Sequence, residues 1–142
     1  MDAIEKIEWE PKYSVSVEEI DLHQKKMLDL FNELIDMKKS NVDARECLNQ
    51  ISIINDYSKI FFSTEERILR RKGYPDFIPH LKSHRNFTKN FITLRRELSE
   101  DVGKLTYEAI DGLRGWLINH ILDNDSLYVP FLRINQYIED FK

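Results

Sequence analysis

The chain has 142 residues, of which 42% are hydrophobic and 32% are charged, and its formal net charge is −4. This balance is typical of one soluble globular domain, and an acidic chain lacks the basic surface that a nucleic-acid binder needs. The single cysteine, Cys47, excludes an internal disulfide and fits a reducing compartment. We find no signal-peptide core and no apolar run that could span a bilayer. We therefore expect a cytoplasmic protein without nucleic-acid or membrane partners.

The first 19 residues are predicted to form an extended arm. They contain Trp9 and the alternation Val15-Ser16-Val17, whose β-branched residues favour extended backbone. No linker, internal repeat or low-complexity tract divides the rest of the chain. The sequence therefore predicts one domain over residues 1–142, with the arm at 1–19, a helical body at 20–128 and a C-terminal segment at 129–142.

Four amphipathic segments make up the helical body, each with apolar residues at the spacing of a helix that buries one face. They run from about Ile20 to Lys39, Ala44 to Lys72, Phe77 to Leu98, and Leu105 to Tyr128. Gly73 ends the second segment after a basic turn, and a glycine accepts the left-handed cap conformation. Pro130 interrupts the last pattern, so that a short C-terminal helix follows. Short connections between long helices predict an all-α, up-down-up-down four-helix bundle.

Four polar residues fall on the apolar faces of these helices. Glu65 lies roughly 40° from the apolar position Phe61 around the helix axis. His80 and His84 are one turn apart, and His120 shares an apolar stripe with Trp116. Imidazoles and a carboxylate are good ligands for iron, zinc or manganese, and burying them without a partner would be costly. Their convergence from three helices predicts a metal site.

Each of these residues also has a simpler interpretation. A single inward histidine is commonly a hydrogen-bonded core residue, and an inward Glu65 can pair with a cation such as Arg67 or Lys25. Asp125 follows His120 by five residues, about 140° around an ideal helix, so helix geometry alone makes it a surface acid. A one-residue π-bulge would instead turn Asp125 inward, and such bulges cluster at functional sites.

The chain resembles the hemerythrin family, specifically its single-domain bacterial members, over nearly its whole length. The resemblance is carried by the N-terminal Trp9, Tyr13, Val15, Val17 and Ile20-Asp21, by Tyr57, Phe62, Glu65-Glu66 and Gly73-Tyr74-Pro75, and by His80-x-x-x-His84-x-x-Phe87, Trp116-Leu117-x-x-His120-Ile121, Asp125 and Tyr128. It implies a four-helix bundle around a non-haem iron centre, which in this family usually holds two irons. One iron's three histidines correspond to His80, His84 and His120. The bridging carboxylates correspond to Glu65 and Asp125, which favours the inward π-bulge.

The sequence departs from the family pattern at both histidines of the second iron. The first position carries Gln24 in Ile20-Asp21-Leu22-His23-Gln24, and the second carries Phe61 in Phe61-Phe62-Ser63-Thr64-Glu65-Glu66. Phenylalanine cannot bind a metal, and glutamine is a weak neutral donor. His23 lies beside Gln24, about 60° from the centre of the apolar stripe, so its bond would leave in a different direction. Phe61 is expected to fill the volume of the lost metal.

These features predict a hemerythrin-like protein with a mononuclear iron site and an open position for a small ligand such as an anion, O2 or NO. One iron supplies one electron, so stable oxygen carriage is not expected. Three alternatives remain open: a two-iron oxygen-binding protein whose second site is rescued by His23, Gln24 or water; a bundle that holds zinc or no metal; and a one-electron redox enzyme acting on superoxide or peroxide. No hydrolytic machinery is visible, which favours a binding protein over an enzyme. Tyr57 and Trp116 are candidate pocket residues, and we expect a monomer.

Overall fold

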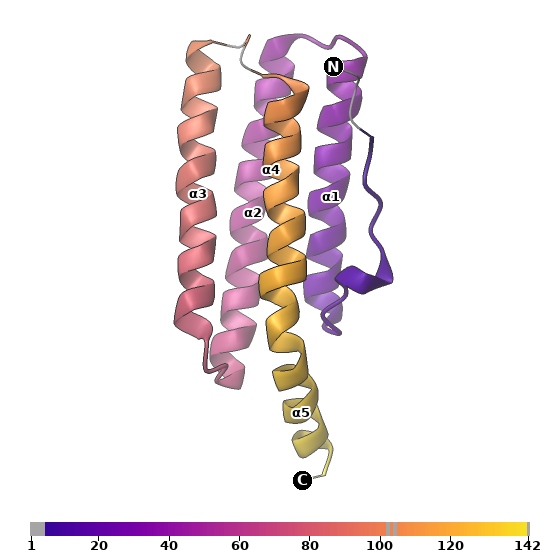
Figure 1. Cartoon of the computed structure of the whole chain (residues 1–142), viewed down its shortest axis with the longest axis vertical. Coiled ribbons are helices and arrows are strands. Elements are labelled where there is room, and N and C mark those ends of the chain that lie inside the picture. The colour runs from indigo at the N-terminus through magenta and orange to yellow at the C-terminus, as the bar shows by residue number, and fades with distance from the viewer. Residues whose placement is uncertain (1–4, 102, 104, 142) are drawn as a thin grey trace.

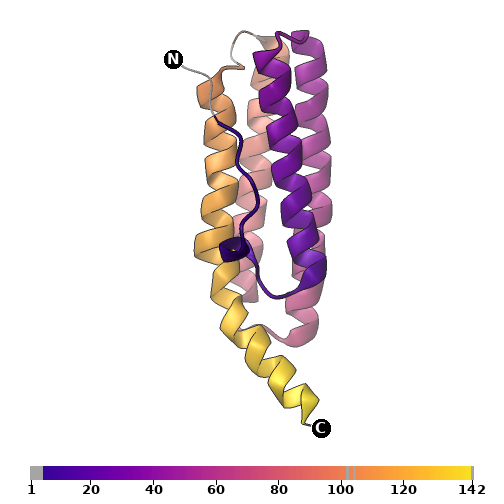
Figure 2. The ribbon, with the colours of Figure 1, turned by 90° about the vertical axis from the view of Figure 1, so that its right-hand side faces the viewer.

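Residues 5–101, 103 and 105–141 are described in the computed structural model of the chain, with the backbone alone at residues 123–126. Four long helices stand side by side in alternating directions (Figures 1 and 2). They are α1 (Glu18–Lys39), α2 (Ala44–Lys72), α3 (Phe77–Glu100) and α4 (Tyr107–Asn119), followed by the π-helical turn η3 (His120–Asn124), the 3-10 turn η4 (Asp125–Tyr128) and the short helix α5 (Val129–Asp140). The described residues contain no strand. The predicted all-α, up-down-up-down bundle with a C-terminal helix is confirmed.

The apolar faces of the four long helices meet in one core. Phe31, Ile54, Phe91 and Leu117, one from each helix, are at most 1% exposed. Burying side chains of this size contributes roughly 1.5–3 kcal/mol each to folding. Within the described part of the chain, no helix is both long and apolar enough to cross a membrane.

The second helix ends as its sequence predicts. Gly73 has φ 73° and ψ 36°, and its N–H donates to the carbonyl of Arg70. The next N–H, of Tyr74, donates to the carbonyl of Leu69 at 3.0 Å, which closes the last turn. This sharp end directs the chain into α3, which carries two of the candidate ligands.

The N-terminal arm is extended along the bundle beside α1 and α4 (Figure 2). The backbone of Ile7 exchanges two hydrogen bonds with the side-chain amide of Asn32 on α1. A 3-10 turn, η1 (Pro11–Tyr13), precedes α1, and Ser16 adopts a left-handed φ of 62°. The predicted extended arm therefore bends at Ser16, and the alternation at Val15-Ser16-Val17 does not form a strand.

Candidate metal centre

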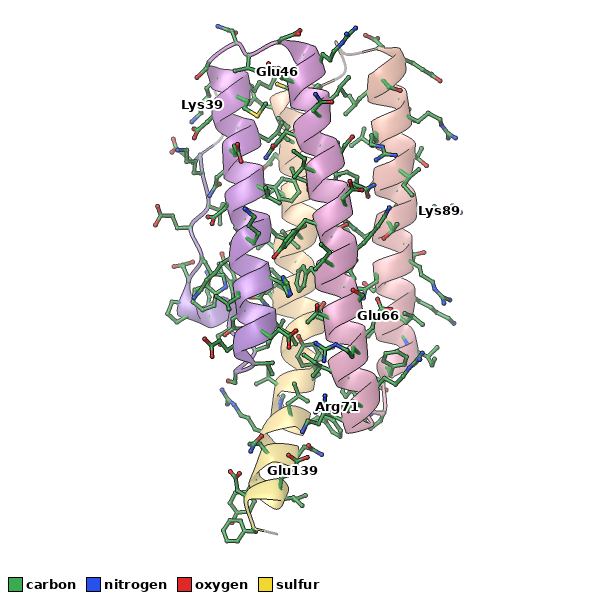
Figure 3. All side chains as sticks on the ribbon, turned by 180° about the vertical axis from the view of Figure 1, so that it is seen from behind. Lys39, Glu46, Glu66, Arg71, Lys89 and Glu139 are labelled. Atoms are coloured by element: carbon green, nitrogen blue, oxygen red, sulfur yellow. The ribbon has the colours of Figure 1, made fainter. Side chains whose placement is uncertain are left out.

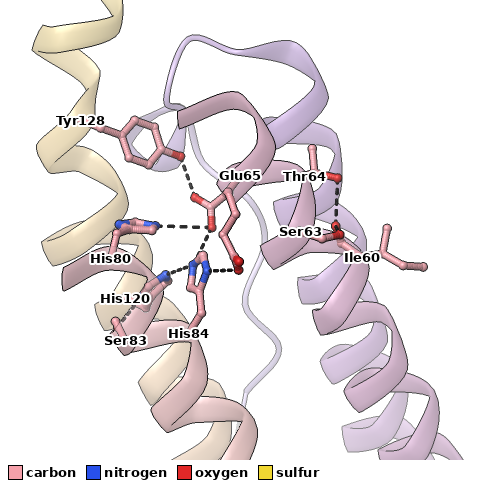
Figure 4. Close-up of polar contacts among 10 residues, drawn as sticks. Ile60, Ser63, Thr64, Glu65, His80, Ser83, His84, His120 and Tyr128 are labelled. Carbon is pink, nitrogen blue, oxygen red and sulfur yellow. Dashed lines mark hydrogen bonds and ion pairs between the residues drawn. The ribbon is translucent and has the colours of Figure 1, made fainter. Parts of the chain in front are cut away.

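One carboxylate and three imidazoles meet inside the bundle (Figure 4). Glu65 comes from α2, His80 and His84 from α3, and His120 from the start of η3. Each offers one ligand atom, and these four atoms lie within 4.8 Å of one another. All four residues are buried, with Glu65 completely inaccessible to solvent. The convergence predicted from the apolar stripes is therefore present in the folded chain.

The neighbours of Glu65 are two histidines and a tyrosine rather than a lysine or an arginine. Its Oε2 accepts a hydrogen bond from the Tyr128 hydroxyl at 2.7 Å, and its Oε1 lies 3.1 Å from His84 Nε2 and 3.8 Å from His80 Nε2. Burial raises the pKa of Glu65, but the neighbouring imidazoles outweigh burial and hold that pKa well below its usual range. Glu65 is therefore an ionised carboxylate in the core.

The two cations considered as partners for Glu65 are engaged elsewhere. Arg67 forms an ion pair with Glu19 at 2.7 Å, and the ammonium of Lys25 lies over the ring of Trp9 at 4.3 Å. A simple Lys or Arg ion pair therefore does not explain why Glu65 is buried.

His84 is oriented by two neighbours on α2. Its Nδ1 lies 2.9 Å from Oε2 of Glu66, and its ring stacks on Phe62 with the centroids 4.1 Å apart and an interplanar angle of 13°. A carboxylate accepts hydrogen bonds, so Glu66 requires the proton on Nδ1 and leaves Nε2 to face the cluster. Carboxylate–histidine pairs of this kind orient metal-bound imidazoles in proteins.

Atoms that carry lone pairs lie close together inside the cluster. His84 Nε2 lies 3.1 Å from Glu65 Oε1 and 3.2 Å from His120 Nε2. A neutral imidazole carries one N–H, and in His84 that hydrogen is on Nδ1, where it faces Glu66. Nε2 of a neutral His84 therefore has no hydrogen to donate to Glu65 or His120. The 3.1 Å contact between His84 Nε2 and Glu65 Oε1 is then favourable only with a cation at these atoms, either a proton or a metal ion. The donor set of three imidazoles and a carboxylate therefore fits iron or zinc.

A proton on His84 is one such cation, and the direction of the pKa shift of His84 favours it. Burial lowers the pKa of His84, but hydrogen bonds to Glu65 and Glu66 outweigh it, so the pKa lies above its ordinary value. A metal ion at the cluster would take the place of this proton.

His120 is oriented in a similar way by its surroundings. Its Nδ1 lies 3.2 Å from the Ser83 hydroxyl on α3, and its ring stacks on Trp116 at 4.7 Å with an interplanar angle of 11°. Trp116 was a candidate pocket residue, and it lies against the face of the His120 ring. The stacking restricts the ring so that Nε2 points towards His84.

The bulge considered for Asp125 is present as the π-helical turn η3. A π turn spreads an extra residue over one turn, which changes the direction of every side chain that follows. Tyr128 lies beyond this turn, and its hydroxyl reaches Glu65. The side chain of Asp125 lies outside the described part of the structure.

The two positions that depart from the family pattern are both buried. Phe61 is 0% exposed, with its ring 5.5 Å from that of Phe62. Gln24 is also 0% exposed, and its Oε1 accepts a hydrogen bond from Trp9 Nε1 at 3.0 Å. An indole can only donate, so the amide oxygen must face Trp9. The remaining amide nitrogen carries hydrogens and cannot coordinate a metal.

His23 and Tyr57 form a separate pair between α1 and α2. Nδ1 of His23 lies 2.6 Å from the Tyr57 hydroxyl, and its Nε2 lies 3.4 Å from Oγ1 of Thr64. Both nitrogens of His23 therefore have polar neighbours on α2, and the described metal-capable cluster does not include this residue.

Three contacts of the cluster were not anticipated from the sequence: Glu66 on His84, Ser83 on His120 and Tyr128 on Glu65. Glu66 and Ser83 are sequence neighbours of cluster residues, but on a helix adjacent residues point about 100° apart. Only the packing of α2 and of η3 against α3, and the π turn before Tyr128, bring these groups to their partners.

Comparisons with known proteins agree with this geometry. Residues 15–132 match the family model of the hemerythrin HHE cation binding domain. The chain is 26% identical to a bacteriohemerythrin of Clostridium acetobutylicum, over 85% of this chain and 97% of that protein, and 27% identical to a myohemerythrin of Theromyzon tessulatum, over 87% and 92%. A crystal structure of a hemerythrin point mutant superposes with a TM-score of 0.80 at 26% identity, covering 87% of this chain and 95% of that one. The chain belongs to the hemerythrin family.

Proposed function

We propose that this protein binds a single iron ion through His80, His84, His120 and Glu65, and presents an open position to a small ligand. The observation that carries the proposal is the contrast between the two halves of the site. One half gathers four buried ligand atoms within 4.8 Å. The positions that the family resemblance assigns to the second iron carry Phe61 and Gln24, and the amide oxygen of Gln24 is bonded to Trp9.

Asp125 is proposed as a further ligand. It follows the π turn that begins at His120, and the family resemblance assigns it a carboxylate role at the iron. With Asp125 included, three imidazoles and two carboxylates leave about one position of a six-coordinate ion for water or an added ligand.

The residues around the centre favour a small, weakly hydrated ligand. Bound iron supplies an open coordination position and a one-electron redox couple. The stacked rings of Phe62 and Trp116 and the buried ring of Phe61 keep the site dry, and charge–charge interactions are stronger in such surroundings. A small anion at the oxidised centre, or NO at the reduced centre, fits this pocket. Sustained oxygen carriage does not, because one iron supplies one electron.

The proposal is tested by measuring the metal content of the full chain, produced in iron-supplemented cells, by plasma mass spectrometry together with its visible spectrum. We expect about one iron per chain and no absorption from an oxo-bridged iron pair. About two irons per chain would overturn the mononuclear site and restore oxygen carriage as the leading function. Zinc or no metal after anaerobic reconstitution with ferrous iron would overturn the assignment of iron.

A further inference from the structure

We infer that the surface between α2 and α3 docks an acidic electron-transfer protein, which exchanges one electron with the centre through His84. This inference rests on the proposed iron site and names the partner of that site. It is carried by a groove beside His84 and by the charges around that groove.

The groove has a volume of about 610 Å³, and the two stacked rings of Phe62 and His84 are among its lining residues. His84 is 2% exposed, with Nε2 towards the cluster and Nδ1 on Glu66. A molecule seated in the groove therefore lies behind the imidazole, separated from the metal position by a single ring. The groove therefore gives a ligand no access to the metal position. The imidazole of His84 nevertheless provides a short covalent path for an electron between the groove and that position.

The charges around the groove have one dominant sign although the chain is acidic overall. A second, adjoining groove shares Ser63 and Glu66 with the first. Cations line the two grooves together: Lys59, Arg67, Arg70, Arg71, Arg85 and Lys89. The lining residues include one acid, Glu66, which is bonded to His84. Figure 3 shows Glu66 on α2 and Lys89 on the neighbouring α3.

Several of these cations are available to a partner. Arg85 and Lys89 are exposed and form no ion pair among the described residues, whereas Arg67 is paired with Glu19 and Lys59 with Asp56. A partner complementary to this surface is acidic. Unpaired cations around a redox centre raise the encounter rate with an oppositely charged partner by roughly 10- to 1,000-fold at low salt.

The docking site is tested first without redox chemistry. The full chain is loaded with zinc, and hexacyanochromate(III), a paramagnetic anion that exchanges no electrons here, is titrated while amide NMR signals are followed. We expect salt-sensitive broadening of signals around Ser63, Glu66, Arg85 and Lys89. Broadening confined to other faces of the molecule, or none, would overturn the docking site whatever metal the protein holds.

The electron route is tested by stopped-flow oxidation of the ferrous protein with two reagents of opposite charge. Each takes one electron from the protein: hexacyanoferrate(III) becomes hexacyanoferrate(II), and tris(phenanthroline)cobalt(III) becomes its cobalt(II) form. In the variant R85E/K89E, we expect about a tenfold slower reaction with the anion at low salt and a faster reaction with the cation.

The matched control is K39E/R45E, which makes the same change in charge at exposed residues near the α1–α2 loop, at the opposite end of the bundle from Arg71 (Figure 3). We expect this control to change both rates by less than about twofold. Equal effects of the two variants would overturn the route through His84. If the metal analysis does not find about one iron per chain but hexacyanochromate(III) broadens the expected NMR signals, only the proposed iron site is contradicted.

Discussion

Glu66 orients His84 without offering an atom to the metal position. Its carboxylate holds the Nδ1 proton, and that single contact decides which nitrogen of His84 faces the cluster. The groups that face the metal would be unchanged without Glu66, but their orientation would be less restricted. The role of Glu66 is thus one of positioning.

Replacing Glu66 by Gln tests this role. The amide is a weaker acceptor than the carboxylate and can also present a donor to Nδ1, so we expect a metal affinity about 10- to 100-fold lower. The affinity is measured by competition with a chelator on the full chain. Glu46→Gln, an exposed acid at the start of the same helix, is the matched control. Equal affinities for the two variants would contradict the role of Glu66.

The affinity for zinc is expected to fall as the pH falls. The pKa of His84 is raised by Glu65 and Glu66, so in the metal-free protein this imidazole keeps its proton to a higher pH than an ordinary histidine. A metal must displace that proton, and below the raised pKa each pH unit weakens apparent binding about tenfold. Calorimetry in buffers of different ionisation enthalpy measures both the affinity and the released proton. Binding that is unchanged from about pH 8 to about pH 5 would contradict this competition.

At the scale of the elements, two turns set the direction of the site residues. The left-handed Gly73 ends α2 and starts the short turn into α3, which carries His80 and His84. The π turn η3 begins at His120 and redirects the chain towards Tyr128 and its contact with Glu65. Each depends on a local backbone conformation that differs from the helices on either side.

Gly73→Ala is expected to destabilise the fold by roughly 1 kcal/mol. A Cβ at this position meets no atom within 4 Å, so the cost comes from the left-handed φ alone. Gly115→Ala in α4 is the control, because a Cβ there also meets nothing but the backbone is helical. We expect this control to stabilise the protein by about 0.5–1 kcal/mol. Urea unfolding of both variants measures the difference, and a shift of the same sign in both would contradict the argument.

At the scale of the whole molecule, the proposed single-iron site depends on one side chain from each of α1 and α2. Gln24 and Phe61 lie on these two neighbouring helices and are both fully buried. The family pattern places a histidine at each position. The proposed loss of the second site therefore rests on these two side chains.

Restoring both histidines is expected to restore the second metal. The double variant Q24H/F61H should bind about two irons per chain and acquire the absorption of an oxo-bridged pair. Each single variant supplies only one of the two missing imidazoles and should stay near one iron. Metal analysis and the visible spectrum measure the outcome, and circular dichroism checks that the helices form. A folded double variant with one iron would show that Gln24 and Phe61 are not what closes the second site.

Much of the bundle could be predicted from the sequence because burial and capping act locally. The second helix starts and ends at Ala44 and Lys72, as its apolar stripe and Gly73 indicate. The inward direction of Glu65, His80, His84 and His120 followed from helical spacing. Ideal helix geometry does not apply beyond His120, because the π turn η3 changes the spacing on which that geometry depends.

The helices, their buried faces and the residues that face the core thus follow from the sequence, because each depends on periodicity along one chain segment. The contacts that give the site its chemistry depend instead on tertiary packing. Glu66 on α2 contacts His84 on α3. Trp9 in the arm contacts Gln24 on α1, and Tyr128, beyond the π turn, contacts Glu65 on α2. These contacts depend on how separate segments pack, and a hydrogen bond with a length near 3 Å cannot be derived from the spacing within either segment.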